Sequence, residues 1–371
     1  MPLYLTEDQV MLRDTARQLM ADEGSIAKQL RKYRDMGCRD GFGHALWKQL
    51  AELGFTGILI GEAEGGLGLG HVEAGIVLEE IGRNLTPSPF LVSAVAVVEA
   101  LKGTPHGARW FPGILSGDTV AALAVDEGPK HRPEAIAMRA ERAGNGFRLT
   151  GRKQFVVQGA SADVIVVAAR TDEGVTLFAV ERNSKGIEVE GVRLADSSIG
   201  ARLDFHGVEV NSDAVVGDVG GGAEVLGRVL DAGRAGAASE MVGLGSAAMA
   251  MTVDYLKQRK QFGRLIGEFQ VLQHRAAHLY SELEIARSAA MKAQQLLDEG
   301  SPEAEAMVSV AKAKAGRAST LAVQEGVQMH GGIGMTDEYD IGLYMKRDRV
   351  LNELFGDSNY HADKLARMKG Y

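Results

Sequence analysis

Two segments of the chain combine basic side chains and glycines at points where long helical patterns end. Residues Arg259–Gly263 (RKQFG) follow one such pattern, and residues Gln328–Gly334 (QMHGGIG) interrupt another. Basic side chains form charge-assisted hydrogen bonds with phosphates. Glycines let the backbone come close to a ligand because they have no side chain. The two segments together therefore predict a site for a phosphate-bearing ligand.

Glu240 is a candidate general base because it stands alone in a helical stretch of small and apolar residues. A carboxylate that is buried without a partner has a raised pKa and can take up a proton. Glu240 follows Arg234 by a helical rotation of about 240°, so the two side chains need not face the same site. A salt bridge at a subunit contact is the alternative for Glu240.

Two other clusters do not predict a ligand site. His274 and His278 have the one-turn spacing of a metal-binding pair, but no third ligand is evident nearby, so we interpret them as surface or packing residues and predict no metal. The glycines of residues Glu64–Gly70 (EGGLGLG) lack the strand–turn–helix context of a nucleotide-binding loop.

The composition is typical of a globular protein with more than one domain. The chain has 371 residues, of which 45% are hydrophobic and 24% charged, enough for two or three domains. The net charge of −8 argues against binding to nucleic acid or to anionic membranes. Cys38 is the only cysteine, so an intramolecular disulfide is impossible and a reducing, cytoplasmic location is expected. We see no secretory signal and no apolar run of about 20 residues, so we expect no membrane span.

The hydrophobic pattern changes twice along the chain and predicts an α+β multidomain protein. Residues 1–118 show helical spacing, residues 119–220 contain short runs of β-branched residues between turn formers, and residues 221–371 return to helical spacing. The middle segment is expected to form a β-sandwich or barrel. Its expected strands are Thr119–Val125, Phe147–Thr150, Gln154–Val157, Val164–Ala169, Val175–Val180 and Arg202–Val210. The last segment carries an apolar stripe made of Leu272, Ala276, Leu279, Leu283 and Ala286.

This order of segments, with several local motifs, resembles the acyl-CoA dehydrogenase family along essentially the whole chain. The motifs are residues 47–55 (WKQLAELGF), 64–70 (EGGLGLG), 151–159 (GRKQFVVQG), 231–234 (DAGR) and 344–349 (YMKRDR). The resemblance implies an N-terminal helical domain, a middle β domain and a C-terminal four-helix bundle. It also implies assembly as a homotetramer, a dimer or a heterotetramer with a homologous subunit.

The resemblance further implies FAD as the cofactor, held between the middle and C-terminal domains. Arg259 would pair with the pyrophosphate, and Gln328 would reach FAD from across a subunit contact. Simpler alternatives exist, because Arg259 is also a helix-end cation favoured by the helix dipole, and glycines commonly end helices. The residues expected to contact FAD are Arg259, Phe262, Gln270, Gln328, Gly331, Gly332 and Phe155.

In the family's reaction a double bond forms between Cα and Cβ of an acyl-CoA thioester. A carboxylate removes the α proton while a hydride passes from Cβ to flavin N5, and hydrogen-bond donors stabilise the developing enolate charge. An electron-transfer flavoprotein is the electron acceptor that the resemblance implies. Asp231 and Arg234 would lie at the acyl-CoA substrate, although their spacing also suits an ordinary helical ion pair.

The chain departs from the family pattern at the general base. Gly356 stands where many relatives carry a glutamate, and Gly233 stands where other relatives place theirs. Asp357, one residue further along, and Glu240 are the remaining candidates. The alternative for Asp357 is a turn or helix-capping role. A third possibility is that the chain lacks the base and is the non-catalytic partner subunit of a hetero-oligomeric acyl-CoA dehydrogenase, contributing assembly and part of the FAD site.

Overall fold

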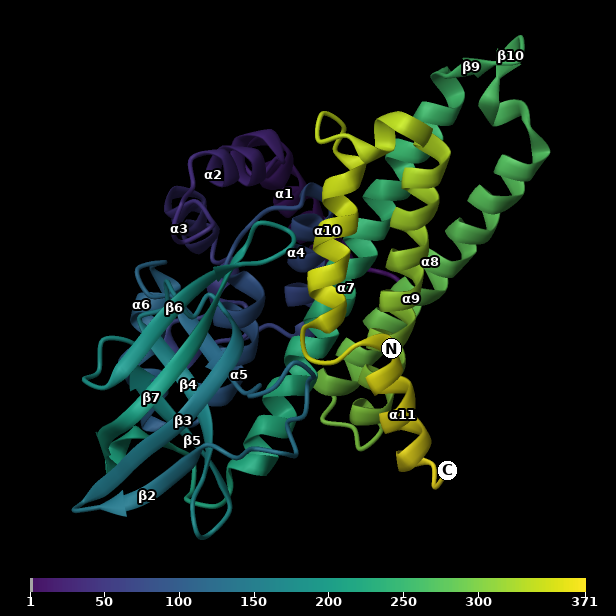
Figure 1. Cartoon of the computed structure of the whole chain (residues 1–371). Helices are drawn as coiled ribbons and strands as arrows, with labels where there is room; N and C mark the ends of the chain where they lie inside the picture. The colour runs from purple at the N-terminus through teal and green to yellow at the C-terminus, as the bar shows by residue number, and fades with distance from the viewer. Residues whose placement is uncertain (1–2) are drawn as a thin grey trace. The chain divides into compact units, whose positions relative to one another are not determined.

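The structure is a computed structural model that describes residues 3–371. Helical, strand-rich and helical segments follow one another along the chain, which confirms the predicted α+β order (Figure 1). Contacts divide the chain into two compact units. The first contains residues up to 31, residues 71–86 and residues 234–371, and the second contains residues 32–70 and 87–233. These units cut across the expected segments 1–118, 119–220 and 221–371, whose boundaries stay predictions.

The second unit is built on one continuous sheet of eight strands. The strands are β1 (Ala121–Ala124), β2 (Arg139–Ala143), β3 (Gly146–Val157), β4 (Val164–Arg170), β5 (Val175–Glu181), β6 (Ile187–Arg193), β7 (Ile199–Asn211) and β8 (Val215–Val216). Their order is β6-β7-β3-β2-β4-β5-β8, and β1 pairs in parallel with β4. Two register shifts between β3 and β7 mark bulges, which bend and twist a sheet. One apolar core that includes Phe147, Phe178 and Phe205 packs against it.

The observed strands differ from the expected ones in two ways. The runs Phe147–Thr150 and Gln154–Val157 belong to one strand, because β3 stays paired with β7 on both sides of a bulge. Strands β2 and β6, and the two-residue strand β8, are missing from the sequence prediction. Most side chains of β2 and β6 are exposed or half-buried, so these two strands lack the apolar runs on which the prediction depends.

Short helices accompany the sheet in the second unit. They are α2 (Lys32–Asp35), α3 (His44–Glu52), η2 (Phe55–Gly57), η3 (Glu62–Glu64), η4 (Phe90–Val97), α5 (Val98–Leu101), α6 (Pro105–Leu115) and η5 (Ser212–Ala214). The fully buried Ser93 of η4 pairs with the backbone of Ala121 in β1. Its Oγ donates to the carbonyl oxygen at 2.7 Å and accepts from the amide nitrogen at 2.9 Å. Buried polar groups need such partners, and this one fixes η4 against β1.

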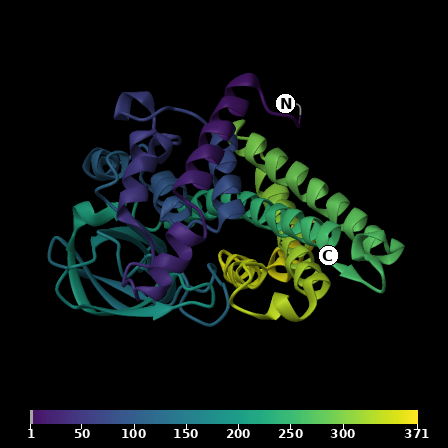
Figure 2. The same ribbon diagram turned by 90° about the horizontal axis from the view of Figure 1, so that it is seen from above.

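The first unit is helical and carries the expected C-terminal bundle. Its elements are α1 (Glu7–Asp22), η1 (Ala27–Arg31), α4 (His71–Asn84), α7 (Gly222–Gln258, from Arg234 on), β9 (Lys260–Gln261), β10 (Arg264–Leu265), η6 (Ile266–Glu268), α8 (Gln270–Asp298), α9 (Ala304–His330), η7 (Gly331–Met335), α10 (Ile341–Glu353) and α11 (Ser358–Met368). Helices α8, α10 and α11 pack against α9, and α7 meets α8 and α9 at Gly245 (Figure 2). Of the expected stripe on α8, Leu279, Leu283 and Ala286 are buried, whereas Leu272 and Ala276 are half-buried.

Two glycines bring α4 and α7 into backbone contact. A Cβ atom on Gly82 of α4 would lie 2.0 Å from the carbonyl oxygen of Glu240 in α7. A Cβ atom on Gly243 of α7 would lie 1.9 Å from the carbonyl oxygen of Glu79 in α4. Only glycine fits at either position, so the spacing of the two helices is fixed by two residues without side chains.

None of the helices within residues 3–371 has both the length and the apolarity needed to cross a bilayer.

Candidate functional site

The segment Arg259–Gly263 forms a tight hairpin directly after α7. Strands β9 and β10 pair in antiparallel fashion, and the two residues between them, Phe262 and Gly263, have φ angles of +54° and +81°. A two-residue hairpin with two positive φ angles favours Asn-Gly, so a phenylalanine is conformationally costly here. Its ring is also 91% exposed. Within the chain the Phe262 ring meets that of Phe269 edge-on, with centroids 6.3 Å apart, and most of the residue is left open to contact with another molecule.

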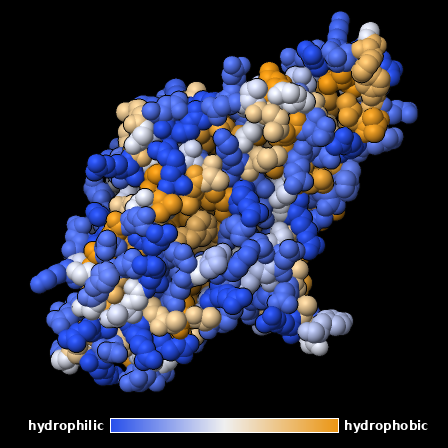
Figure 3. Space-filling view, viewed as in Figure 1, coloured by the Kyte–Doolittle hydropathy of each residue, from blue (hydrophilic) through white to orange (hydrophobic). Residues whose placement is uncertain are grey.

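The neighbours of Phe262 share its exposure. Arg259 and Gln270 are both exposed, on either side of the hairpin. Val271, in the first turn of α8, is 63% exposed. In the surface view, hydrophobic atoms gather at the end of the bundle where the hairpin lies (Figure 3). The hairpin thus offers a guanidinium, an amide and apolar surface to a ligand or to a second subunit.

The second predicted segment ends α9 in an open glycine turn. Gln328, Gly331 and Gly332 are exposed, and Gly331 has φ +64° and ψ −138°, a backbone conformation available in practice only to glycine. A Cβ atom on Gly332 would meet no atom within 4 Å, and its φ angle is not positive. Neither packing nor backbone conformation in this chain requires glycine at position 332. Close approach of a bound group to the backbone would require glycine there. Gln328, Gly331 and Gly332 therefore fit a cofactor.

His330 connects the two segments, although no local sequence pattern singles it out. Its ring lies 4.4 Å from the ring of Tyr255 in α7 and 4.8 Å from that of Tyr339. Burial lowers the pKa of His330, while the hydrogen bond between its Nδ1 and the carbonyl oxygen of Gly326 opposes this effect. The stack joins the end of α7 to the end of α9, so both predicted segments lie at the same end of the bundle.

Phe155 lies in the second unit and shares the backbone strain of Phe262. It is half-buried in β3 at the register shift between Lys153 and Val156, and its φ angle is +56°. Among residues 3–371, six non-glycine residues have positive φ angles, and Phe155, Phe262 and Phe355 are three of them. Such strain costs about 1–3 kcal/mol per residue and gathers at functional sites. All three lie in segments that the sequence resemblance connects with the flavin or the base.

Helix α7 carries three of the predicted site residues, and all three are buried. Asp231 is 9% exposed, and Arg234 and Glu240 are each 2% exposed. Oε1 of Glu240 accepts hydrogen bonds from Arg347, at 2.6 Å from Nη2 and 2.9 Å from Nε. This ion pair joins α7 to α10 within one chain, which gives Glu240 a structural role. Its role as a base stays a prediction.

The loop between α10 and α11 has no room for a side chain at position 356. Gly356 has a φ angle of +100°, and a Cβ atom there would lie 2.4 Å from Cδ1 of Tyr360. The guanidinium of Arg234 lies 5.6 Å from the centre of the Tyr360 ring. The carbonyl oxygen of Phe355 lies 3.1 Å from Nε of Arg234, which donates to it, and 3.0 Å from Nε2 of His361. Helices α7 and α11 therefore both hold this loop through one carbonyl group.

Lys312 is a buried lysine that also contacts this loop, and no local sequence pattern marks it. Its Nζ donates to the carbonyl oxygens of Leu351 at 3.0 Å, Asn352 at 3.2 Å and Gly356 at 2.9 Å. Complete burial, and after it the nearby charge of Arg234, lowers the pKa of Lys312 to about 7. The side chain ties the end of α10 and the loop to α9.

Asp357 caps helix α11. Its Oδ1 accepts hydrogen bonds from the backbone N–H groups of Asn359 at 3.0 Å and Tyr360 at 2.7 Å. This is the helix-capping role considered as the alternative from the sequence. The carboxylate is half-buried, and its catalytic role stays a prediction.

Comparisons with known proteins agree with this architecture. Family models described as the acyl-CoA dehydrogenase N-terminal, middle and C-terminal domains match residues 6–118, 126–206 and 220–369. A mitochondrial isovaleryl-CoA dehydrogenase of Solanum tuberosum is 32% identical over 327 residues, which is 83% of this chain and 78% of the relative. The chain belongs to the acyl-CoA dehydrogenase family.

Two solved structures are similar over nearly their whole length. The Tcur3481-Tcur3483 steroid ACAD aligns with a TM-score of 0.90 and 28% identity, covering 98% of both chains. The ChsE4-ChsE5 complex from Mycobacterium tuberculosis aligns with a TM-score of 0.91 and 25% identity, covering 100% of this chain and 99% of the other.

Proposed function

We propose that this chain takes part in the FAD-dependent α,β-dehydrogenation of an acyl-CoA thioester. Its membership of the family supports this reaction class. When bound, FAD supplies the acceptor at flavin N5 for the hydride that leaves Cβ. The observation that carries the proposal is the environment of Phe262. Its backbone has a strained positive φ angle, the residue is 91% exposed, and a basic segment directly precedes it.

Each predicted contact has a stated role in this proposal. Arg259 neutralises the FAD pyrophosphate, Phe262 packs on the cofactor, and Gln270 bonds its nucleotide part. The exposed Gln328 and the open turn at Gly331 and Gly332 contact FAD from a neighbouring subunit. Phe155 packs near the flavin. The residues in these roles are Arg259, Phe262, Gln270, Gln328, Gly331, Gly332 and Phe155.

The substrate's α proton needs a carboxylate within reach. Asp357 is the carboxylate next to the position at which many relatives carry the base, and we propose it for that role. Arg234 and Asp231 are the proposed contacts to the acyl-CoA. Glu240 is a weaker candidate base, because its carboxylate is already committed to the ion pair with Arg347.

A second candidate function is favoured by the environment of Gly356. Its positive φ angle and the ring of Tyr360 leave no room for a glutamate in this backbone conformation. A chain built in this way suits a non-catalytic partner subunit, which would contribute assembly and part of the FAD site to a heterotetramer. The solved ChsE4-ChsE5 structure, similar over the whole chain, is itself a complex of two differently named chains. A homotetramer or dimer suits the first candidate.

Anaerobic flavin bleaching distinguishes the two candidates. The purified yellow protein is mixed with short, branched and ring-containing acyl-CoA thioesters, and the flavin absorbance is followed. Bleaching of the chain alone supports the self-sufficient enzyme. Bleaching only after co-expression with a homologous chain supports the partner subunit. A colourless protein that does not retain added FAD in either preparation contradicts both. Electron transfer from the reduced protein to an electron-transfer flavoprotein, and a cytoplasmic location, are further parts of the proposal.

A further inference from the structure

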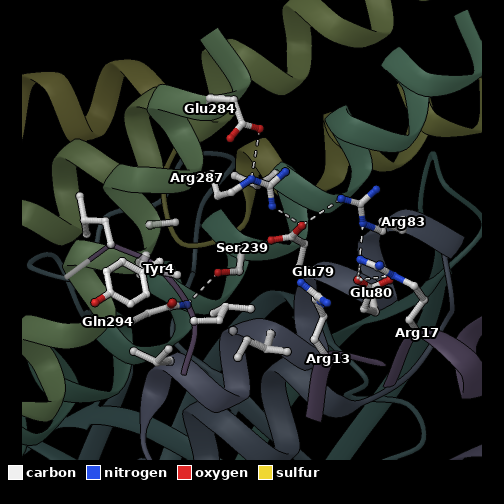
Figure 4. Close-up of a pocket in the computed structure, with 18 residues that line it drawn as sticks. Tyr4, Arg13, Arg17, Glu79, Glu80, Arg83, Ser239, Glu284, Arg287 and Gln294 are labelled. Atoms are coloured by element: carbon white, nitrogen blue, oxygen red, sulfur yellow. Dashed lines mark hydrogen bonds and ion pairs between the residues drawn. The ribbon is translucent and has the colours of Figure 1, made fainter. Parts of the chain in front are cut away.

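A cavity of about 390 Å³ lies within the first unit, among α1, α4, α7, α8 and the segment that precedes α1 (Figure 4). Its volume is within the usual range of small-molecule sites, roughly 300–1,000 Å³. The residues of the proposed FAD contacts, the Gly356 loop and Arg234 do not line it. It is therefore a different place from the site described above.

One wall of the cavity is a chain of arginines and glutamates. Arg17 bonds Glu80 at 2.8 Å, and Arg83 lies 3.6 Å from the same carboxylate. Arg83 also bonds Glu79 at 3.1 Å, and Arg287 bonds Glu79 as well. The lining side chains include four arginines and three glutamates, the two remaining ones being Arg13 and Glu284. The arginines of the lining therefore outnumber its glutamates by one.

Arg13 is the arginine least committed to this network. It donates to its neighbour Asp14, through Nε at 2.9 Å and Nη2 at 2.8 Å. The Asp14 side chain is 57% exposed, and that of Arg13 is 33% exposed, so solvent weakens their attraction. Arg13 lines the cavity together with Glu79 and the other arginines (Figure 4). This guanidinium can pair with an anion without leaving a buried carboxylate unpaired.

The lining also has an apolar part, called here the apolar wall, and a polar amide. Gln294 donates to Oγ of Ser239 at 2.7 Å, and Figure 4 draws Gln294 and Tyr4 on the left, away from Arg17 and Arg83. The apolar side chains of the lining are Leu3, Leu5, Val72, Ile76, Val242, Ala290 and Met291. A lining that combines guanidinium groups with aliphatic side chains matches a ligand with an anionic head and a hydrocarbon tail.

We infer that this cavity binds an aliphatic carboxylate, with the carboxylate at Arg13 and the chain against Met291 and Ile76. The planar guanidinium groups suit a carboxylate because they donate two parallel hydrogen bonds. The apolar wall selects for chain length, since each buried methylene strengthens binding by about fourfold. The ligand is thus a free acid of medium chain length, and the site is separate from the acyl-CoA site.

Calorimetric titration of the FAD-loaded, full-length protein with sodium octanoate tests this inference. We expect saturable binding, with hexanoate about fifteenfold weaker for its two missing methylenes and octan-1-ol about tenfold weaker for its missing charge. The Met291→Trp variant fills the apolar wall and should abolish binding. The Arg13→Gln variant should weaken octanoate about fivefold and leave octan-1-ol unchanged.

Matched variants outside the cavity provide the controls. Met11→Trp changes a methionine that is 62% exposed on α1, and Arg228→Gln removes an exposed arginine of α7. Both should bind octanoate as the parent does. If Met291→Trp does not fold, Arg13→Gln decides the question by itself. The inference is overturned if octanoate does not bind, or if Met291→Trp and Arg13→Gln, when folded, bind it like the parent, because the acid then lies elsewhere. Flavin bleaching by acyl-CoA is read independently and tests only the proposed function.

Discussion

The ring of Tyr360 occupies the space into which a side chain on Gly356 would extend. A Cβ atom on Gly356 would lie 2.4 Å from Cδ1 of that ring. The Arg234 guanidinium lies over the same ring at 5.6 Å, so the tyrosine is held between the loop and α7. In this chain an aromatic ring and a cation take up the room next to the position where many members of the family carry a carboxylate.

The clash at Gly356 should appear as a loss of stability. The Gly356→Ala variant is expected to lose about 1–3 kcal/mol in the free energy of unfolding measured with urea, from backbone strain and overpacking. Gly300→Ala is the matched control, because Gly300 also has a positive φ of +60° but nothing within 4 Å of an added Cβ. It should lose less than Gly356→Ala. Adding Tyr360→Ala to Gly356→Ala should recover part of the lost stability. Equal losses in Gly356→Ala and Gly300→Ala would contradict a clash between the added Cβ and Tyr360.

The two roles of Asp357 can be separated by the choice of substitution. Asparagine caps helices about as well as aspartate but cannot accept a proton as a carboxylate does. We expect Asp357→Asn to keep its FAD and its stability while flavin bleaching by acyl-CoA is lost, in whichever assembly bleaches. Asp357→Ala should also lose about 0.5–2 kcal/mol of stability through the missing cap. Unchanged bleaching in Asp357→Asn would remove this residue as the base.

Lys312 should make stability depend on pH in an identifiable window. Its pKa is lowered from 10.5 to about 7, so between these values the unfolded chain binds more protons than the folded chain. The contribution of Lys312 to the free energy of unfolding therefore rises with pH across this window, by at most about 1.4 kcal/mol per pH unit, and falls as pH drops towards 7. Lys312→Met should remove this slope. Lys314→Met, two residues along α9 at a partly exposed ion pair with Glu282, should keep it. Parallel urea titrations at pH 7 to 10 provide the comparison, and equal slopes in parent and Lys312→Met would rule out the lowered pKa.

Arg259 is expected to hold FAD without supporting the fold. Arg259→Ala should weaken FAD retention by about 1.5–3 kcal/mol, the range for a hydrogen bond to a charged group. Arg367→Ala is the control, since Arg367 is a 76% exposed arginine at the other end of the chain. FAD dissociation constants measured by fluorescence should differ only for Arg259→Ala. Equal FAD dissociation constants for the two variants would contradict the FAD contact and leave Arg259 as a helix-end cation.

Phe262 offers a test in which folding and binding change in opposite directions. Asparagine suits the positive φ angle of the hairpin better than phenylalanine. Phe262→Asn is therefore expected to fold at least as stably as the parent, while FAD retention falls because the ring is lost. Thermal unfolding of the FAD-free protein and FAD titration give the two readouts. Retention of FAD equal to the parent's would exclude the ring as a cofactor contact.

Local patterns in the sequence predicted those features that depend on neighbours in the chain. The long helices, the glycine end of α9 and the basic segment after α7 are of this kind. The position of Tyr360 against Gly356, the three carbonyl partners of Lys312 and the stack at His330 depend on contacts between separate helices, which spacing along the chain does not encode. Strand β6 was missed for another reason. Its apolar alternation is short, because Ile187 and Val189 alternate with exposed glutamates but the rest of the strand is exposed.

The close contact of α4 with α7 limits how the inferred carboxylate site can change during evolution. Gly82 and Gly243 set the distance between these helices, and both helices also supply walls of the cavity. An alanine at either glycine would force the helices apart and would shift charged and apolar walls together. Single substitutions of lining side chains can therefore change ligand preference. Widening the cavity as a whole requires several simultaneous substitutions along α4 and α7.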